Sequence, residues 1–201
     1  MKKLLAIMVL GLFLSSSAYA EDPNTCYEEK SNEAFKAAID KNYSKALKLA
    51  EEAVKIKETA CAYIVLSELY YNGWGTKKDL QKAFYYNKLS AEKDSDQAQK
   101  LLAISYLKGE GVEKNPKEAF KWFEILAQKN DANGQTYLAY LYSSGTGIEK
   151  NLTLSYMWFY IVSKQFFEPA NSEMKKLKKY MSEVDIKKAV KMGDAWLSKK
   201  K

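Results

Sequence analysis

Hydrophobic residues in this chain recur three and four positions apart, which is the period of one face of an α-helix and not the alternation of a β-strand. Leu102, Ala103 and Tyr106 lie on one such face. Polar stretches that contain glycine separate successive helical runs. The pattern predicts a helical hairpin over 26–57 and helices over about 59–71, 79–92, 115–128 and 151–164. It also predicts a helix that contains Ala98 and Tyr106, one that contains Gly134 and Tyr142, and two more between 169 and 199.

The glycine-containing stretches form a repeat. Residues 73–79 read GWGTKKD, and the related sequences GEGVEKN and GTGIEKN begin 36 and 72 residues later. A period of this length is typical of stacked helical units, none of which buries its own apolar face alone. We therefore expect an all-α solenoid of about ten helices in five hairpins.

Within each unit, small and aromatic residues recur at fixed positions. Small side chains let two helices approach closely, and the rings fill the space against the next hairpin. The loop glycines are expected to take positive φ angles, and an N-cap residue follows each loop; Pro116 and Glu118 add a first-turn proline and a capping box. The recurring positions are Ala62, Ala98 and Gly134; Tyr70, Tyr106 and Tyr142; Ala83, Ala119 and Ser155; Tyr86, Trp122 and Trp158; and the N-caps Asp79, Asn115 and Asn151.

The unit from Ala98 to Phe123 reads Ala-x3-Leu-Ala-x2-Tyr-x2-Gly-x-Gly-Val-x2-Asn-x3-Ala-x2-Trp-Phe and resembles the Sel-one-like repeat, a relative of the tetratricopeptide repeat. The tail over 181–196 is similar to the terminal helix that closes bacterial members. The resemblance implies a right-handed α/α solenoid that serves as an adaptor or binding scaffold. The expected organisation is 26–57 as a first hairpin or cap, 59–93, 95–129 and 131–165 as repeats, and 169–199 as a C-terminal capping hairpin.

Residues 1–20 have the composition of a secretory signal peptide. Lysines precede an apolar run from Leu4 to Leu14, and Ala18 and Ala20 flank the expected cleavage point. This run of about 11 residues is shorter than the ~20 that a spanning helix needs. We expect cleavage after Ala20, a periplasmic or secreted location, and a mature chain of residues 21–201 that forms a single domain with no membrane span.

The chain contains neither Arg nor His, although its formal net charge is +7. Without guanidinium groups, recognition of phosphate and guanine is weakened, so nucleic acid is not an expected partner. Without imidazole there is no Ser-His-Asp triad and no His metal ligand. The Gly73-x-Gly75 loop follows a helix and lacks GKS or GKT, so it does not indicate a phosphate site. We predict no catalytic residue, no metal site and no cofactor.

Cys26 and Cys61 are the only cysteines and lie 35 residues apart, close to the repeat period. This spacing places them near equivalent turns of neighbouring hairpins. In an oxidising compartment we expect them to form a disulfide. A pair of catalytic thiols is the other interpretation, but it lacks a CxxC spacing and a nearby His.

By analogy with tetratricopeptide geometry, the first helices of the hairpins should line a concave groove that binds a protein partner. The predicted positions mix polar, aromatic and apolar groups, as a protein-binding patch does. Trp74 lies in the first glycine loop, where it is either packed or an exposed contact. The predicted groove residues are Ile64, Glu68, Tyr71, Asn72, Gln97, Lys100, Ile104, Lys108, Thr136, Tyr140 and Ser143.

The first functional hypothesis is a monomeric, non-enzymatic interaction scaffold. The second is an immunity-type inhibitor that neutralises a toxic effector enzyme in the periplasm, which the size, export signal and cysteines fit equally well. The third is a hydrolase of cell-wall or β-lactam substrates, as has been claimed for some cysteine-rich relatives. The sequence contains no nucleophile motif that supports the third hypothesis.

Overall fold

The computed structural model describes residues 29–166 and 170–200. Within these ranges the chain forms ten helices and no strand, which confirms the all-α solenoid. The predicted signal peptide over 1–20 and Cys26 lie outside the described residues. The helices are α2 (Glu29–Ile39), α3 (Tyr43–Ile56), α4 (Ala60–Asn72), α5 (Leu80–Glu92), α6 (Asp96–Lys108), α7 (Pro116–Gln128), α8 (Ala132–Ser144), α9 (Leu152–Phe166), α10 (Ala170–Lys178) and α11 (Glu183–Ser198).

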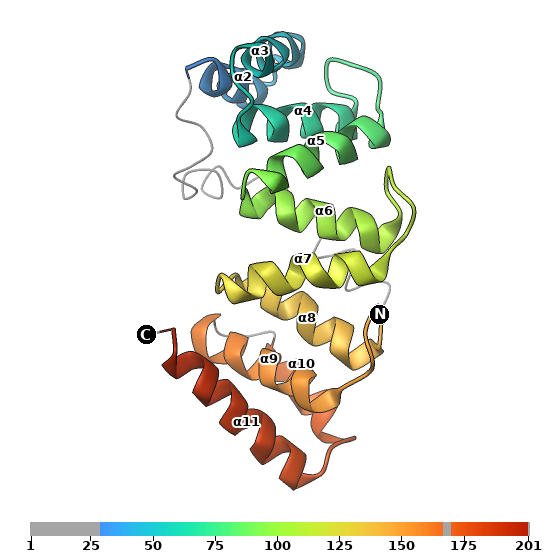
Figure 1. Ribbon diagram of the computed structural model, residues 1–201, viewed down its shortest axis with the longest axis vertical. Coiled ribbons are helices and arrows are strands. Elements are labelled where there is room, and N and C mark those ends of the chain that lie inside the picture. The colour runs from blue at the N-terminus through green and yellow to red at the C-terminus, as the bar shows by residue number, and fades with distance from the viewer. Residues whose placement is uncertain (1–28, 167–169, 201) are drawn as a thin grey trace.

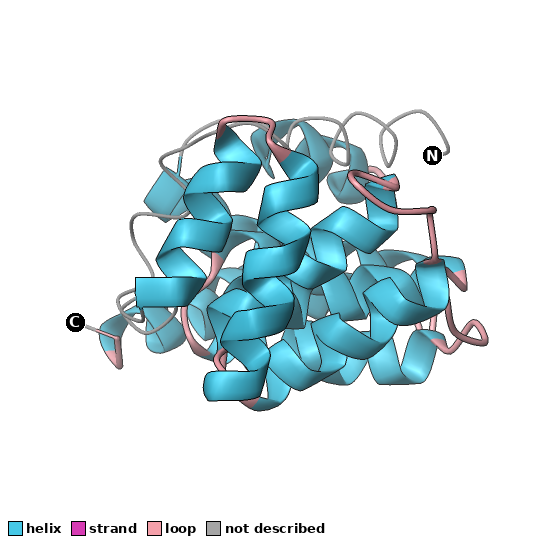
Figure 2. Cartoon of the chain, turned by 90° about the horizontal axis from the view of Figure 1, so that it is seen from above, coloured by secondary structure: helices cyan, strands magenta, loops and turns pink. Residues whose placement is uncertain are grey.

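The helices stack in chain order into an elongated molecule, with α2 and α3 at one end and α11 at the other (Figure 1). From α2 to α9, each helix packs on the next one along the chain, and both α10 and α11 pack on α9. Seen along the stack from above, the helices lie over one another and loops join their ends (Figure 2). Contacts between near neighbours are what a repeat architecture relies on for stability.

The first glycine of each loop ends a helix, as predicted. Gly73, Gly109 and Gly145 follow α4, α6 and α8 with φ angles of 73°, 77° and 73°. Asp79 and Asn115 are confirmed as N-caps, because their side chains accept hydrogen bonds from Lys82 and Glu118 backbone N–H groups. Each glycine loop thus begins at a glycine in the αL conformation, which ends one helix, and finishes at the N-cap residue of the next helix.

The expected capping box at Asn115 forms only in part. Its side chain accepts the N–H of Glu118 at 3.2 Å, as predicted. The Asn115 N–H does not bond back to Glu118, however, but donates to the carbonyl of Tyr106 at 2.8 Å. The Glu118 carboxylate instead pairs with Lys121 at 2.6 Å. The corresponding bonds from Asp79 to Tyr70 and from Asn151 to Tyr142 also close their loops against the preceding helix.

The second glycine of each loop lies against the hairpin before it. A Cβ atom added to Gly75 would be 2.6 Å from the carbonyl carbon of Tyr43, at the start of α3. At Gly111 and Gly147 it would collide with the carbonyl oxygens of Leu80 and Pro116, at the starts of α5 and α7. We call these three contacts the glycine seats. They join neighbouring hairpins backbone to backbone, which only glycine permits.

The recurring small residues are buried in the core, and the recurring aromatic rings are buried there or pack against it. Ala62, Ala98 and Ala119 are fully buried, and a Cβ on Gly134 would be 2.6 Å from Leu126 Cβ. Trp158 is buried as well. Buried hydroxyls add specific bonds within hairpins: Ser67 donates to the Ala83 carbonyl at 3.0 Å and Ser155 to the Ala139 carbonyl at 2.7 Å. The close approach of the helices thus rests on small residues and paired hydroxyls.

Trp74 is packed, which decides between the two interpretations of this residue. Its ring stacks on that of Tyr43, with centroids 4.7 Å apart and planes inclined by 17°. The contact joins the first glycine loop to the hairpin of α2 and α3, beside the Gly75 seat. The first hairpin has no glycine loop of its own. The glycine loop of the following hairpin packs against it, as happens at the later hairpins.

Candidate protein-binding site

The eleven predicted groove residues lie on the first helices of three successive hairpins: α4, α6 and α8. We call the surface that they form the first-helix face. Equivalent positions follow the 36-residue period, so Ile64, Lys100 and Thr136 occupy one level of the repeat, and Glu68, Ile104 and Tyr140 another. The fold therefore presents corresponding positions of three units in register.

Eight of the eleven side chains are half-buried, which is the exposure expected of residues that line a binding surface. The other three are buried. Ile64 and Ile104 are 4% and 8% exposed and belong to the hydrophobic core, so neither offers an open contact. The half-buried residues are Glu68, Tyr71, Asn72, Gln97, Lys108, Thr136, Tyr140 and Ser143.

Lys100 is the third buried residue, with 9% of its surface exposed. Burial lowers the pKa of its ammonium group, and the nearby carboxylates of Asp131 and Asp96 oppose that effect. A lysine in such a position keeps its aliphatic stem packed against the helices. It contributes mainly packing to the middle of the first-helix face.

One end of the face carries a polar cluster that includes a loop residue. The Tyr71 hydroxyl donates to Glu110 Oε2 at 3.2 Å, and Lys108 lies 3.4 Å from Glu110 Oε1. Burial raises the pKa of Tyr71, and the Glu110 carboxylate raises it further. In the sequence, Glu110 stands out only as a residue of a glycine loop. It is recognised only once α4 and the loop after α6 are placed side by side.

Tyr140 lies near the other end of the face. Its ring makes an edge contact with Phe159, with centroids 5.1 Å apart. Burial raises the pKa of Tyr140 to about 12, with a further contribution from Glu173 on α10. Like any neutral tyrosine hydroxyl, that of Tyr140 can both donate and accept hydrogen bonds. Glu173 adds an acidic group from the C-terminal hairpin beside it.

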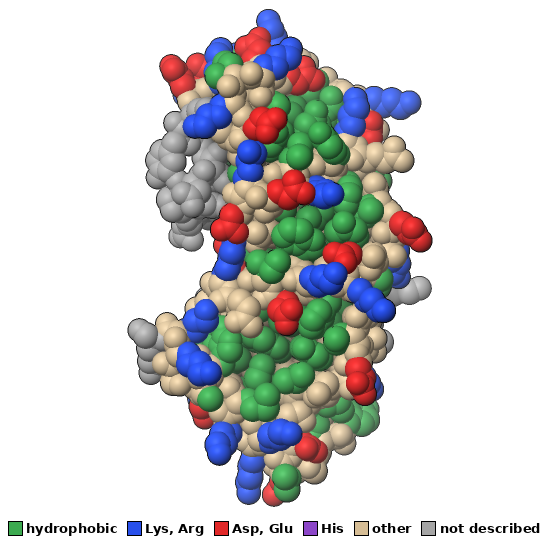
Figure 3. Space-filling model, in the orientation of Figure 1, with side chains coloured by type: hydrophobic (Ala, Val, Ile, Leu, Met, Phe, Trp, Pro, Cys, Tyr) green, Lys and Arg blue, Asp and Glu red, His purple; other side chains and the backbone are tan. Residues whose placement is uncertain are grey.

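The second helices also carry exposed apolar residues. Tyr85 on α5 and Ile125 on α7 are 56% and 41% exposed. Figure 3 shows hydrophobic side chains gathered in a band down the middle of one face, at the levels of α4 to α9, with charged side chains between and around them. Single exposed apolar residues are normal on protein surfaces.

Cys61 lies in the first turn of α4 and is buried. Its Sγ is 4.0 Å from the Ser31 carbonyl oxygen in α2. Its predicted partner, Cys26, precedes α2 by three residues in the sequence and lies outside the described residues. The disulfide therefore stays a prediction.

The described residues contain neither a metal cluster nor a membrane-spanning helix. In the described part of the chain, no group of three or more His, Cys, Asp and Glu residues could hold a metal ion. Nor does any helix there combine the length and hydropathy required to cross a bilayer.

Stacked helical hairpins with a half-buried polar and aromatic face define the class of α-solenoid repeat proteins. Comparison with protein families narrows that class: the chain belongs to the Sel1 repeat family. Sel1 repeats generally mediate protein–protein interactions, and proteins built from them are generally non-enzymatic scaffolds. The first match falls in the hairpin that lacks a glycine loop. The residues that match the Sel1 repeat are 36–55, 62–95, 96–131 and 132–162.

Two solved structures share the fold. The crystal structure of a Sel1 repeat protein from Oxalobacter formigenes is 25% identical, with a TM-score of 0.64 over 72% of this chain and 59% of that one. A protective antigen of uropathogenic Escherichia coli strains, which displays an SLR fold, is 22% identical, with a TM-score of 0.70 over 84% of this chain and 36% of that one. Cysteine-rich protein B of Helicobacter pylori is 24% identical, with a TM-score of 0.47 over 73% of this chain and 97% of that one.

The chain spans 59% and 36% of the length of the first two of these proteins. The likeness to the second is one of fold alone. No curated protein matches the chain.

Proposed function

We propose that this chain is an exported, non-enzymatic scaffold that binds a protein partner along the first-helix face. The observation that carries the proposal is the line of half-buried tyrosine, amide and hydroxyl side chains on three successive first helices. Tyr71 and Tyr140 offer rigid rings with a polar tip, a combination enriched at protein interfaces. A partner that buries about 1,600 Å² in total would form an interface of ordinary size.

Export and a disulfide belong to the same proposal. The signal-like composition of residues 1–20 supports export to the periplasm or beyond. The buried position of Cys61 next to α2, which follows Cys26 in the sequence, supports the disulfide. The intact mass of the protein from its native compartment tests both, because it should lack residues 1–20 and be two hydrogens lighter than the dithiol. Retention of residues 1–20 or of both thiols would contradict it.

The binding face is tested by blocking it. Affinity capture from the native compartment with mass spectrometry first identifies the partner. A variant with three lysines at half-buried positions of the face should then lose capture, because each adds bulk and charge where the partner docks. These positions are polar, so the melting temperature should change little. The three substitutions are Gln97→Lys, Thr136→Lys and Ser143→Lys.

The matched control adds the same three charges to exposed positions on the second helices α3, α5 and α7. It should capture the partner as the unchanged chain does. Equal capture by the face variant, or equal loss in the control, would refute the assignment of the face. The control substitutions are Ser44→Lys, Gln81→Lys and Gln128→Lys.

We also propose that the chain acts as a monomer and does not bind nucleic acid. The absence of Arg from the sequence supports the second point. Size-exclusion chromatography with light scattering, repeated with added DNA or RNA, should give a single monomer peak; a larger species in either run would contradict the corresponding point.

A further inference from the structure

Lysines that directly follow the second helices contact the turn before the first helix of the same hairpin. At the end of α5, Lys93 Nζ lies 3.9 Å from Glu58 Oε2 and 5.9 Å from the centre of the Tyr63 ring. Glu58 and Tyr63 lie in the turn before α4 and in the first turn of that helix. The lysine thus joins two successive turns of the solenoid.

The next unit repeats this contact with stronger bonds. Lys129 Nζ donates to Asp94 Oδ1 at 2.5 Å, to Asp96 Oδ1 at 2.6 Å and to Gln99 Oε1 at 3.3 Å. Gln99 also donates to Asp94 at 3.0 Å. The 36-residue period relates Lys129 to Lys93, Asp94 to Glu58 and Gln99 to Tyr63. We call this recurring contact of a lysine with the preceding turn the lysine latch.

The third place in this series has no lysine. Thirty-six residues after Lys129 the chain has Gln165, and the turn residues are Asn130 and Gln135. Gln135 donates to Asn130 Oδ1 at 2.9 Å, as Gln99 does to Asp94. The side-chain oxygens of Gln135 and Gln165, however, are buried and accept no hydrogen bond from the residues that the structure describes. In the earlier unit the corresponding oxygen of Gln99 accepts from Lys129, so this place lacks a donor.

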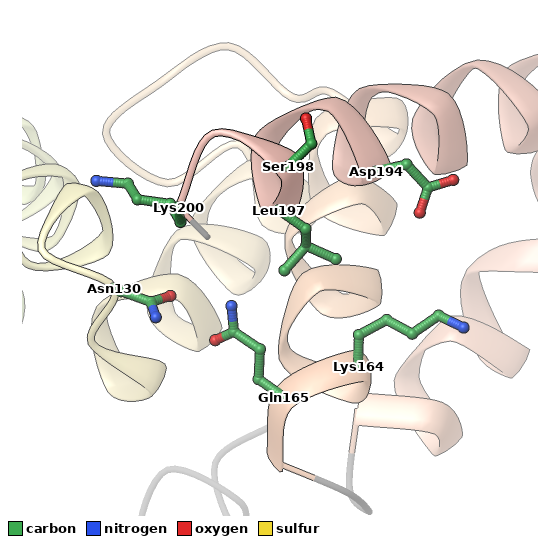
Figure 4. Close-up of a pocket in the computed structure, with 7 residues that line it drawn as sticks. All are labelled: Asn130, Lys164, Gln165, Asp194, Leu197, Ser198 and Lys200. Atoms are coloured by element: carbon green, nitrogen blue, oxygen red, sulfur yellow. The ribbon is translucent and has the colours of Figure 1, made fainter.

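A cavity of about 590 Å³ lies at this point. Figure 4 shows the amides of Asn130 and Gln165 directed toward its centre, whereas the ammonium groups of Lys164 and Lys200 point away from it. Lys200 Nζ donates to the Gln128 carbonyl, and Lys164 Nζ lies 5.3 Å from the centre of the Tyr160 ring. The cavity is lined by Asn130, Lys164, Gln165, Asp194, Leu197, Ser198 and Lys200.

The electrostatic setting favours a cationic donor. The lining includes residues at the C-terminal ends of three helices: Asn130 just beyond α7, Gln165 in the last turn of α9 and Ser198 at the end of α11. The C-terminal end of a helix carries a negative partial charge, which attracts cations. Asp194 adds a carboxylate, which accepts from the Tyr160 hydroxyl at 2.8 Å.

We propose that this pocket binds a primary ammonium group, that of a lysine side chain on a protein partner, in the place that the Lys129 ammonium holds one unit earlier. Gln165 lines the cavity and Gln135 is buried beside Asn130, and the ammonium donates to the side-chain oxygens of both glutamines. The pocket uses no residue of the first-helix face. Its test uses a small amine, so it can succeed or fail independently of the proposed partner.

The test is a titration of the full chain followed by nuclear magnetic resonance of its side-chain amides. The probe is Nα-acetyl-lysine amide, and the matched control is Nα-acetyl-norleucine amide, which has the stem without the ammonium. The lysine probe should give saturable shifts of the Asn130, Gln135 and Gln165 amide signals, and the control should not. The Gln99 amide, whose place is filled by Lys129, serves as an internal reference and should not shift.

Two substitutions of Gln165 test whether the ammonium binds at this residue. Gln165→Lys places an ammonium in the pocket and should reduce the shifts of the Asn130 and Gln135 amides to those of the norleucine control. Gln165→Glu supplies a carboxylate and should lower the probe concentration needed for half-saturation. Equal shifts with norleucine, preferential shifts with Nα-acetyl-glutamate, or no shift with any probe would overturn the proposal.

Discussion

At the scale of single residues, the two glycines of each loop have different roles. Gly109 ends α6 with a φ of 77°, and an added Cβ would have its nearest neighbour at 3.4 Å. Gly111 has a similar φ of 76°, but its Cα lies against the Leu80 carbonyl. The positive φ angles could be predicted from the sequence, because they depend on local turn chemistry. The seats could not, because they depend on where the preceding hairpin lies.

This difference predicts the effect of adding one methyl group. Gly109→Ala should lower the free energy of unfolding by about 1 to 2 kcal/mol, the cost of a left-handed conformation for a residue with a Cβ. Gly111→Ala carries the same cost and a collision with backbone that cannot move alone, so it should lose about 4 kcal/mol or more. Urea unfolding measures both, and equal losses would show that the seat contributes nothing.

The predicted face shows the same limit of sequence reasoning. Helical spacing correctly placed its residues on three first helices, but the spacing does not show how far each side chain is buried. Ile64 and Ile104 lie below the surface because small residues in their clusters, such as Ala98 and Ala119 respectively, let the helices approach closely. Glu110 was missed because it joins the face from a loop, 39 residues after Tyr71. Such contacts depend on stacking geometry, which the repeat period does not specify.

At the scale of helices and turns, most boundaries follow from caps that are visible in the sequence. The predicted helix over 79–92 corresponds to α5 with its N-cap at Asp79, and that over 115–128 to α7 with its N-cap at Asn115. The lysine latches were not predicted. Their partners lie about 30 to 35 residues away, and their geometry depends on two turns lying side by side.

The Lys129 latch predicts a pH dependence of stability. The hydrogen bond from Lys129 lowers the pKa of Asp94 below its ordinary value of 3.8, an effect that burial opposes and Gln99 supports. A carboxylate with a lowered folded-state pKa stabilises the fold above the unfolded value, and this contribution is lost as the pH falls through the folded value. Acid should therefore weaken the latch.

Lys129→Met should lower the melting temperature by about 1 to 3 °C near neutral pH, the range for a pair worth about 0.2 to 1 kcal/mol in a domain of this size. The difference from the unchanged chain should shrink as the pH falls from about 5 to about 2. Calorimetry over that range makes the comparison. Lys88→Met is the control, because Lys88 lies 4.0 Å from Glu92 in an exposed pair. A difference that persists at low pH would assign the effect to packing.

At the scale of the whole molecule, the stack is closed at one end by α11. Ala189 is fully buried there, and Gly193 lets the helix approach the ring of Tyr160 on α9. Trp158 and Trp196 meet edge to face, with centroids 5.7 Å apart. The helical spacing and lysines of the tail correctly indicated a helix with a polar outer side. Capping repeats of this kind keep solenoids soluble.

Deletion of residues 167–201 should expose the apolar surface of α9 that α11 covers, including Trp158, which is 5% exposed in the intact chain. Loss of several large buried side chains at about 1.5 to 3 kcal/mol each should lower the melting temperature by about 10 °C or more and promote self-association. Calorimetry and light scattering measure these effects. Deletion of residues 199–201 alone is the control, and a monomeric, equally stable product of the longer deletion would contradict this role of α11.

The glycine seats also have a consequence for how such a chain can change over time. The seats are contacts between backbones, so they set the spacing of the hairpins without reference to the side chains on the first helices. The identity of those side chains can therefore diverge while the spacing stays fixed. Duplication or loss of one 36-residue segment would lengthen or shorten the binding surface by one unit and leave the junctions intact.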